Sequence, residues 1–229
     1  PLVKFLMKKA LQLGHRKFDE TYELGPPLGL WERIQYSILD RIVLKKARQV
    51  FGGKLRGAVV GGAACPPDVI HFMDSIGTPL CEGYGLTETS PIIAVNTTEH
   101  RKIGTVGKPI GGVNVYIIKN NEEDGNNEVL ARGHVGEICC TGPNIMRGYH
   151  NNPQATDAAL STRADDERLF HTGDLGWMDE EGFIRVTGRI KEQYKLENGK
   201  FVVPTPIEDA IGMSRFVDQV VVAGANRPY

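Results

Sequence analysis

The chain has 229 residues, 41% hydrophobic and 24% charged, a composition typical of a globular protein with one large domain and room for part of another. Its 27 lysine and arginine residues balance 28 acidic residues, so the net charge of −1 creates no field favouring nucleic acid, and we expect no nucleic-acid partner. The apolar runs fall well short of the roughly 18 residues that a membrane-spanning helix needs.

The first third of the chain alternates helical and strand patterns. The predicted elements are helices over residues 1–14, 31–51 and 66–77, and strands over 54–60 and 78–82, the first of them buried. Proline at the start of the third helix and Gly77 at its end are the expected boundary residues. This alternation predicts an α/β fold with part of a doubly wound sheet, in which ligands collect beyond the carboxyl ends of the strands.

After residue 91 the pattern changes to short strands separated by Gly, Asn, Pro and acidic turns. The strands are predicted over 113–118, 136–141, 175–178 and 183–187. They indicate a small antiparallel β subdomain over about 92–188, packed against the sheet domain. The remaining expectations are a solvated hairpin loop over 120–127, a helix over 156–168, and, in a different unit, a short helix over 207–211 and a strand over 219–225.

The strands over 175–178 and 183–187 form a predicted hairpin, because residues 179–182 between them have the chemistry of a hairpin turn. The pairing we expect is Met178 with Phe183, Leu175 with Val186 and Asp174 with Thr187. This pairing brings Asp174 and Arg189 to the same open end of the hairpin.

Two interpretations of this pair stay open. Asp174 can accept hydrogen bonds from a sugar diol while Arg189 addresses an anion nearby. Alternatively, the two residues form a salt bridge that closes the hairpin. Gly173 and Gly188 precede the two residues, and glycine there favours the first interpretation because a ligand could approach the backbone closely.

The four cysteines show no C-x-x-C spacing. They are Cys65, Cys81, Cys139 and Cys140. Cys139 and Cys140 are adjacent in a predicted strand, so their side chains should point to opposite faces and not share a metal. We expect reduced thiols and an intracellular protein, cytoplasmic or peripheral to an organelle membrane. The chain begins at Pro1 without an initiator methionine, so the lack of a targeting segment carries no weight.

Three short motifs occur in a fixed order. They are Glu82-Gly83-Tyr84-Gly85-Leu86-Thr87-Glu88, His171-Thr172-Gly173-Asp174-Leu175 and Gly188-Arg189-Ile190-Lys191. Together they resemble the motifs of the AMP-forming adenylate-forming superfamily, and residues 195–204 look most like those of long-chain fatty-acid–CoA ligases. The resemblance runs from about residue 30 to the end of the chain and implies roles for single residues.

Through this resemblance, Gly83, Tyr84 and Gly85 would line an adenine ring. Thr87 would donate its hydroxyl to a phosphate oxygen, and Glu88 would hold Mg²⁺ between phosphates. The open alternative for Thr87 and Glu88 is a turn whose side chains cap a following helix.

Asp174 resembles the aspartate that binds both ribose hydroxyls in this superfamily, and Arg189 the arginine beside it. Lys191 resembles the interdomain hinge, with an exposed lysine in a turn as the alternative. The resemblance thus makes Thr87, Glu88, Arg189 and Lys191 the candidate catalytic residues.

Three more implied positions are less specific. Gly61, Gly62 and Ala63 resemble the segment where acyl chain and adenine meet, with a tight strand-to-helix turn as the alternative. Gly199 would flank the tunnel for CoA. Gly136-Glu137 and Arg147-Gly148-Tyr149 match a further motif that we interpret as structural, with no catalytic role.

The resemblance implies that residues 1–188 are the C-terminal portion of the large AMP-binding domain and that 189–229 are the hinge and the beginning of the small C-terminal domain. Such an enzyme uses ATP and Mg²⁺ to convert a long-chain fatty acid to an acyl-adenylate, and then CoA to form the thioester. Alternatives are a medium-chain or aryl acid–CoA ligase and a non-catalytic nucleotide- or acyl-binding remnant. The superfamily's phosphate loop and terminal catalytic lysine have no counterpart here. We therefore expect a fragment that is inactive alone, and membrane association through missing segments stays open.

Overall fold

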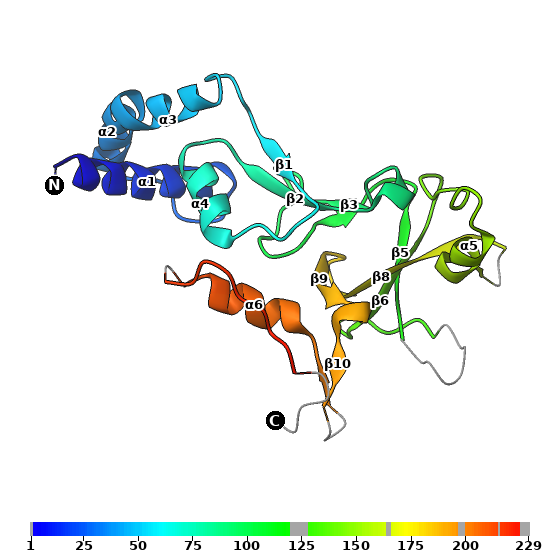
Figure 1. Ribbon diagram of the computed structural model, residues 1–229. Coiled ribbons are helices and arrows are strands. Elements are labelled where there is room, and N and C mark those ends of the chain that lie inside the picture. Colours follow the sequence, from blue (N-terminus) through cyan, green and yellow to red (C-terminus); the bar gives the residue numbers. More distant parts are fainter. Residues whose placement is uncertain (1, 120–127, 164–165, 197–199, 215, 225–229) are drawn as a thin grey trace. The chain divides into compact units, whose positions relative to one another are not determined.

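The computed structural model describes residues 2–119, 128–163, 166–196, 200–214 and 216–224 (Figure 1). It contains two compact units, one of Pro1–Gly83 with Asn96–Ile103 and one of Tyr84–Val95 with Gly104–Tyr229. The predicted loop over 120–127 and the candidate residue Gly199 lie outside the described residues. The predicted division of the chain between residues 188 and 189 stays a prediction.

Helices dominate the first unit. Its helical elements are α1 (Leu2–Thr21), α2 (Leu30–Leu39), a π-helical turn (Asp40–Leu44), α3 (Lys45–Val50) and α4 (Pro67–Ser75). The first predicted helix is therefore longer than expected, and the second is confirmed as a run that contains the π-helical turn. A Cβ on Gly14 would overlap the carbonyl of Ser75, so glycine at this position lets α1 pack closely against α4.

The predicted strand–helix–strand unit is confirmed. Strand β1 (Ala58–Val60) pairs in parallel with β2 (Leu80–Tyr84), and α4 lies between them in the chain. The expectation of a buried strand over 54–60 is wrong in extent and in burial. Ala58 and Val60 pack against the core, but alternation turns Val59 to the other face, where it is 66% exposed.

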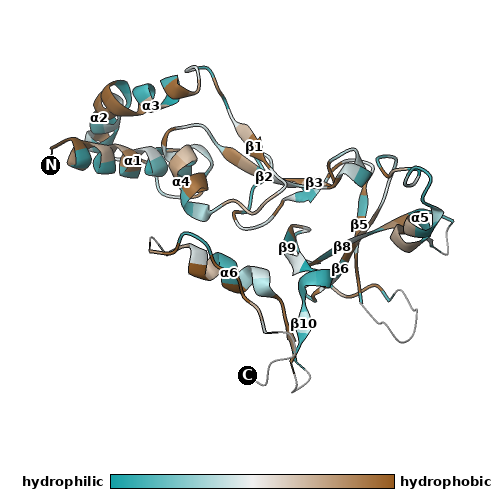
Figure 2. Ribbon diagram, in the orientation of Figure 1, coloured by the Kyte–Doolittle hydropathy of each residue, from teal (hydrophilic) through white to brown (hydrophobic). Residues whose placement is uncertain are grey.

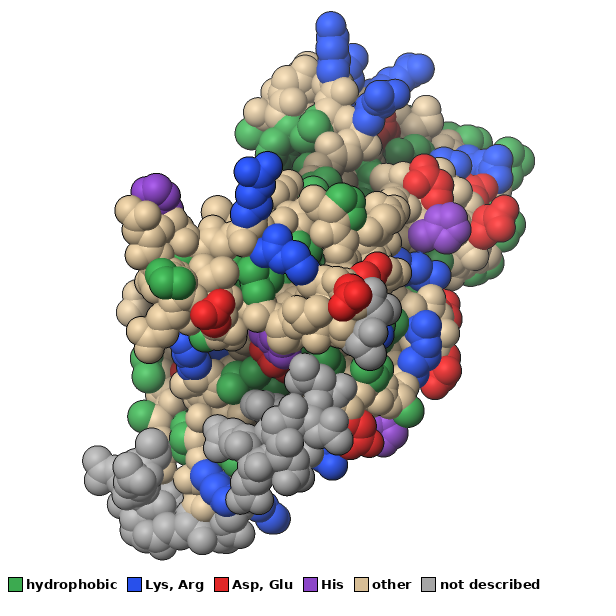
Figure 3. All heavy atoms as spheres, turned by 90° about the vertical axis from the view of Figure 1, so that its right-hand side faces the viewer, with side chains coloured by type: hydrophobic (Ala, Val, Ile, Leu, Met, Phe, Trp, Pro, Cys, Tyr) green, Lys and Arg blue, Asp and Glu red, His purple; other side chains and the backbone are tan. Residues whose placement is uncertain are grey.

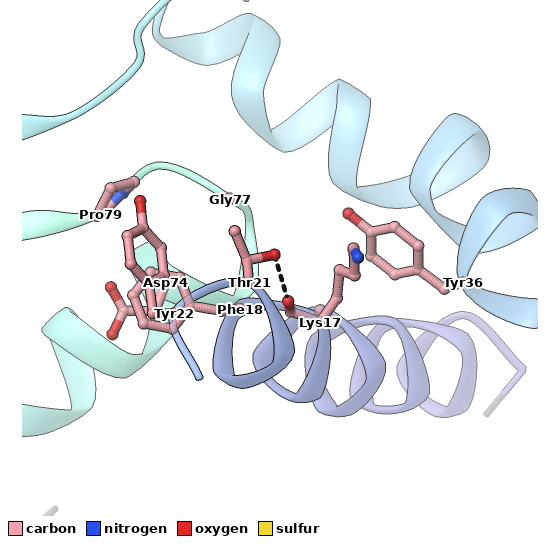
Figure 4. A pocket seen from close by; sticks show the side chains of 9 residues that line it. Lys17, Phe18, Thr21, Tyr22, Tyr36, Asp74, Gly77 and Pro79 are labelled. Carbon is pink, nitrogen blue, oxygen red and sulfur yellow. Dashed lines mark hydrogen bonds between the residues drawn. The ribbon is translucent and has the colours of Figure 1, made fainter. Parts of the chain in front are cut away.

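A cavity of about 190 Å³ lies in the first unit (Figure 4). Its lining residues are Gly14, Lys17, Phe18, Thr21, Tyr22, Tyr36, Asp74, Gly77 and Pro79. The Thr21 hydroxyl donates to the carbonyl of Lys17 at 2.8 Å, as in any helix whose threonine bonds back one turn. None of the candidate site residues lines this cavity, so it gives them no support.

An antiparallel sheet forms the centre of the second unit, as predicted, but it has five strands where four were expected (Figure 1). Its strands are β5 (Asn114–Ile118), β6 (Gly136–Thr141), β7 (Leu160–Thr162), β8 (Arg168–Met178) and β9 (Ile184–Arg189). The order is β5-β6-β8-β7, and β9 also pairs with β8. Cys140 belongs to the main core of this unit and Cys139 to a smaller core, so the adjacent thiols do point to opposite faces.

The remaining elements of the second unit are short. They are a 3₁₀ turn (Thr87–Thr89), β3 (Ala94–Val95), β4 (Lys108–Pro109), α5 (Pro153–Ala159), a 3₁₀ turn (Ile190–Glu192), β10 (Tyr194–Lys195), β11 (Phe201–Val202) and α6 (Pro204–Gly212). The predicted helix over 207–211 is confirmed within α6.

Two predicted elements of the second unit are wrong. The helix expected over 156–168 is the helix α5, which stops at Ala159, followed by strand β7, because Leu160 takes extended angles and pairs with Phe170. The strand expected over 219–225 is absent from the described residues 219–224. The N–H of Val222 donates to the Glu208 carboxylate at 2.7 Å, so a side chain supplies the acceptor that a neighbouring strand would provide.

Asn152 caps the N-terminus of α5, where its Oδ1 accepts a hydrogen bond from the N–H of Ala155 at 3.0 Å. We expect Asn152→Ala to lower the free energy of unfolding by about 1 kcal/mol, because one helix-end donor loses its acceptor. Urea unfolding measures this change, with the exposed Gln154→Ala as the matched control. A loss no larger than that of the control would show that the cap contributes nothing.

Hydrophilic residues interrupt the hydrophobic ones along α1 (Figure 2). In the part of the chain that the structure describes, no helix is long and apolar enough to cross a membrane. Basic and acidic side chains are interspersed on the face shown in Figure 3.

Candidate functional site

The hairpin of β8 and β9 brings Asp174 directly opposite Arg189. The observed pairs are Met178 with Ile184, Trp177 with Arg185, Gly176 with Val186, Leu175 with Gly188 and Asp174 with Arg189. The expected register, with Asp174 opposite Thr187, is therefore wrong, although the meeting of Asp174 and Arg189 is confirmed.

Two local features cause the difference in register. At the turn, the N–H of Asp179 donates to the Phe183 carbonyl at 2.9 Å and the N–H of Phe183 donates to the Asp179 carboxylate at 2.8 Å. The turn therefore pairs Asp179, not Met178, with Phe183. Further along, a β-bulge between Leu175 and Gly176 shifts the pairing by one more residue.

The Asp174 carboxylate is the centre of the candidate site. Tyr84 donates its hydroxyl to Asp174 Oδ2 at 2.6 Å, and Arg189 Nε lies 3.2 Å from Asp174 Oδ1. Each of these three residues comes from a different one of the three sequence motifs. The structure thus joins the motifs through side-chain contacts around one carboxylate.

Burial controls the ionisation of this centre. Asp174 is 5% exposed, and its burial raises the pKa of the carboxyl above its ordinary value although the Tyr84 hydrogen bond and the Arg189 charge lower it. Burial, followed by the negative charge of Asp174, likewise raises the pKa of the Tyr84 hydroxyl. Tyr84 therefore stays protonated, and its hydroxyl donates a hydrogen bond to the carboxylate.

An irregularity in β8 presents Asp174. On β6 Glu137 and Cys139 are two residues apart, but their partners on β8, Leu175 and His171, are four apart. The extra length contains Gly173, whose φ of +71° suits glycine and whose N–H donates to Glu137 Oε1 at 3.0 Å. Such bulges re-aim side chains next to functional sites, and this one precedes Asp174 directly.

The two glycines have different local requirements. A Cβ on Gly173 would have nothing within 4 Å, so glycine is favoured there by its positive φ and not by lack of space. A Cβ on Gly188 would overlap Val203, so glycine there accommodates a residue of the protein itself.

Thr87 and Glu88 lie in the 3₁₀ turn that follows Tyr84, with Thr87 exposed and Glu88 half-buried. The hydroxyl of Tyr149 donates to Glu88 Oε1 at 2.8 Å. The local cap comes from Thr89, whose hydroxyl accepts from the N–H of Leu86 at 3.0 Å. Thr87 and Glu88 are thus not the capping pair that the alternative interpretation requires.

Gly83 belongs to the first unit and Gly85 to the second, where a Cβ on Gly85 would overlap the carbonyl of Pro91. Lys191 is exposed in the 3₁₀ turn after Arg189.

Gly61, Gly62 and Ala63 lie exposed after β1 in the first unit. Gly62 has a φ of +82°, and a Cβ on Gly61 would come within 2.9 Å of the Gly83 carbonyl. Gly62 thus has the positive φ of a turn, Gly61 lies close to the backbone of β2, and the ligand-binding role of the three residues stays a prediction.

Two residues that the sequence analysis gave no role contact the candidate site. Tyr149 bonds Glu88, and Glu137 holds the backbone of Gly173. Both belong to the motif that was interpreted as structural, so their place in that motif was the available signal. Sequence spacing reveals neither contact, because each joins residues that are far apart in the chain.

Comparison with known proteins supports the resemblance that the three motifs indicate. The family model described as AMP-binding enzyme matches residues 30–150, and the model described as AMP-binding enzyme C-terminal domain matches 191–229. The long-chain-fatty-acid–CoA ligase FadD15 of Mycobacterium bovis is 39% identical over 212 residues, which cover 93% of this chain and 32% of that protein. Long chain acyl-CoA synthetase 8 of Arabidopsis thaliana is 34% identical over 202 residues, covering 86% and 27%.

Solved structures show the same fold. The o-succinylbenzoate CoA synthetase MenE of Bacillus subtilis in complex with AMP has a TM-score of 0.67 at 26% identity, over 82% of this chain and 37% of that one. ATP-bound MatB of Rhodopseudomonas palustris has a TM-score of 0.62 at 29% identity, over 79% and 34%. The chain spans about a third of the length of the curated relatives it matches. With more than half of its residues matched by the family model, the chain belongs to the family of AMP-binding enzymes.

Proposed function

We propose that this chain is part of a long-chain fatty-acid–CoA ligase that forms AMP. ATP and the fatty acid give an acyl-adenylate and pyrophosphate, and the CoA thiol then displaces AMP. The observation that carries the proposal is the contact of Tyr84, Asp174 and Arg189, which joins three motifs of one family around a buried carboxylate. The choice of a long-chain fatty acid as the substrate rests on the names of the relatives: FadD15 is a long-chain-fatty-acid–CoA ligase.

The Asp174 carboxylate fits a ribose diol. Its two oxygens offer about four acceptor positions, and the contacts with Tyr84 and Arg189 use one on each oxygen. One position on each oxygen remains for one hydroxyl of the diol. The Arg189 side chain is 63% exposed, so its guanidinium is accessible to a phosphate.

Glu88 fits a Mg²⁺ ion that is shared with phosphates. Such ions are held by one or two carboxylates together with substrate oxygens, and the half-buried Glu88 supplies one carboxylate. The Tyr149 hydroxyl fixes one of its oxygens, and the other would serve as the ligand. When bound, Mg²⁺ would neutralise phosphate charge, while Thr87 donates its exposed hydroxyl to a phosphate oxygen.

The remaining assignments follow from the same family. Gly83 and Gly85 let the backbone approach the adenine beside Tyr84, and Gly61, Gly62 and Ala63 leave room for the acyl group. Lys191 serves as the hinge between the large domain, residues 1–188, and the small domain that begins at 189, where Gly199 flanks the tunnel for CoA. All four cysteines are free thiols, which supports a location inside the cell.

Exchange of labelled pyrophosphate into ATP tests the proposal in the whole enzyme. We expect exchange that depends on a long-chain fatty acid, and CoA-dependent thioester formation with the same acid. Exchange driven by an aryl or medium-chain acid in its place would select the first alternative. Nucleotide binding without exchange for any acid would contradict catalysis and leave a binding remnant.

We expect Glu88→Gln to raise the Mg²⁺ concentration needed for half-maximal exchange by at least about tenfold, because an amide oxygen replaces a charged ligand. A Mg²⁺ titration of the exchange rate measures this change. The matched control is Glu180→Gln, an exposed acid in the turn between β8 and β9. An unaltered titration for Glu88→Gln would remove Glu88 from the ion site.

A further inference from the structure

Three potential metal ligands face one another where β6 and β8 pair. Cys139 and His171 are direct partners in the register, and Glu137 is two residues from Cys139 on the same strand. His171 Nδ1 lies 3.4 Å from Cys139 Sγ and 3.1 Å from Glu137 Oε2. The ligand atoms of the three side chains all lie within 4.8 Å of one another.

The distances from His171 Nδ1 to the other two ligand atoms are close to those of a tetrahedral zinc site. Typical Zn–S, Zn–N and Zn–O bond lengths place a sulfur and a nitrogen ligand about 3.5 Å apart, and a nitrogen and an oxygen ligand about 3.4 Å apart. The observed distances of 3.4 and 3.1 Å differ from these by a few tenths of an ångström at most. Thiolate, imidazole and carboxylate are also the three ligand types that Zn²⁺ takes in proteins.

Hydrogen bonds orient His171 and Glu137 through the atoms that would not bind the ion. Ser161 Oγ lies 2.8 Å from His171 Nε2, the ring nitrogen that faces away from Cys139 and Glu137. The N–H of Gly173 donates to Glu137 Oε1, the carboxylate oxygen that His171 does not contact. Hydrogen-bond partners of this kind fix the orientation of the ring and the carboxylate of metal ligands. An alternative interpretation is a hydrogen-bonded relay of Ser161, His171 and Glu137, but such a relay gives no reason for Cys139 to lie beside the same ring nitrogen.

The site is dry on one side and open on the other. Cys139 is fully buried, whereas the side chains of Glu137 and His171 are 13% and 19% exposed. Two of the three side chains therefore reach solvent, from which the ion and a water ligand would come. Sites with three protein ligands keep such a position for water.

We propose that Glu137, Cys139 and His171 bind one Zn²⁺ ion, with water as the fourth ligand. Binding displaces the thiol proton of Cys139 to solvent, so the thiolate and the Glu137 carboxylate together balance the two charges of the ion. This site is separate from the Mg²⁺ site proposed at Glu88 and does not rest on the proposed ligase activity.

Zinc titration of the purified, metal-free protein against a chromophoric chelator tests the site. We expect one strong equivalent of Zn²⁺ per chain, weakened at least about 100-fold by Cys139→Ser and by His171→Gln, since each removes a ligand. The matched control is Cys140→Ser, because Cys140 is equally buried on the opposite face and should leave the affinity unchanged. Co²⁺ in place of Zn²⁺ should give a thiolate charge-transfer absorption that only the two ligand variants abolish.

Circular dichroism and thermal melting without metal establish that each variant folds. If Cys139→Ser does not fold, His171→Gln decides, because that side chain is partly exposed and tolerates replacement more readily. Absence of a strong equivalent in the wild-type protein would overturn the proposal. So would a folded His171→Gln variant that binds as the wild type does. His71→Gln separates the site from the group of His15, His71 and Asp74, and a loss confined to that variant would also overturn it.

Discussion

Replacing Asp174 with asparagine is expected to reduce kcat/KM for ATP by about 10- to 150-fold without loss of fold stability. The substitution turns a charge-assisted acceptor of the ribose hydroxyls into a neutral one, at a cost of about 1.5–3 kcal/mol. The asparagine oxygen can still accept from Tyr84. Its amide then faces Arg189, which is 63% exposed and can turn into solvent.

The direction of the stability change follows from the pKa of Asp174. Burial raises the folded-state pKa above the ordinary value of 3.8, so the folded protein favours the neutral carboxyl. The resulting contribution to stability is complete below that ordinary value and is lost as the pH rises through the folded-state pKa. At pH 7 the buried charge is therefore a cost that asparagine does not carry, and the free energy of unfolding should stay equal or rise.

Steady-state kinetics in ATP and urea unfolding at pH 7 and at pH 3.5 measure the two effects. The advantage of the variant in stability should be present at pH 7 and shrink at the lower pH. Asp157→Asn, at an exposed position of α5, is the matched control for both measurements. Normal kinetics together with a loss of stability at pH 7 would identify Asp174 as only the ion-pair partner that closes the hairpin.

The sequence contained enough to predict the meeting of Asp174 and Arg189, but not the way in which they meet. Alternation of apolar residues identifies the two strands, whereas the register depends on the Asp179 side chain at the turn and on a bulge. Neither changes the alternation pattern, so a register error is expected from sequence alone. The contact of Tyr84 with Asp174 spans 90 residues, and the sequence did not predict it.

Errors elsewhere arise where tertiary contacts override local preference. The β-branched residues from Val220 to Val222 favour a strand, yet a strand needs a neighbour, and here the Glu208 side chain takes the Val222 N–H. Leu160 continues the helical pattern of α5 but pairs with Phe170 on β8. The strand–helix–strand order of β1, α4 and β2 was predicted correctly, though not the extent and burial of β1, because proline, glycine and apolar spacing all agree there.

The substitution Lys191→Pro is expected to separate the two half-reactions of the proposed ligase. Lys191 lies exposed in the 3₁₀ turn that follows Arg189, and the proposal makes it the pivot on which the small domain moves between adenylation and thioester formation. Hinges work through a few residues that absorb large changes of φ and ψ. Proline fixes φ near −65° and also restricts Ile190 before it, so one of the two arrangements becomes inaccessible.

We expect the variant to keep much of its adenylation and to lose about 100-fold in thioester formation, which corresponds to a cost of about 3 kcal/mol for the disfavoured arrangement. Pyrophosphate exchange driven by fatty acid measures the first step, and acyl transfer from preformed acyl-adenylate to CoA measures the second. Lys191→Ala is the matched control, because it removes the charge and keeps φ free. If Lys191→Pro slows both steps by the same factor, the residue is structural, and if it slows neither, the pivot lies at another residue.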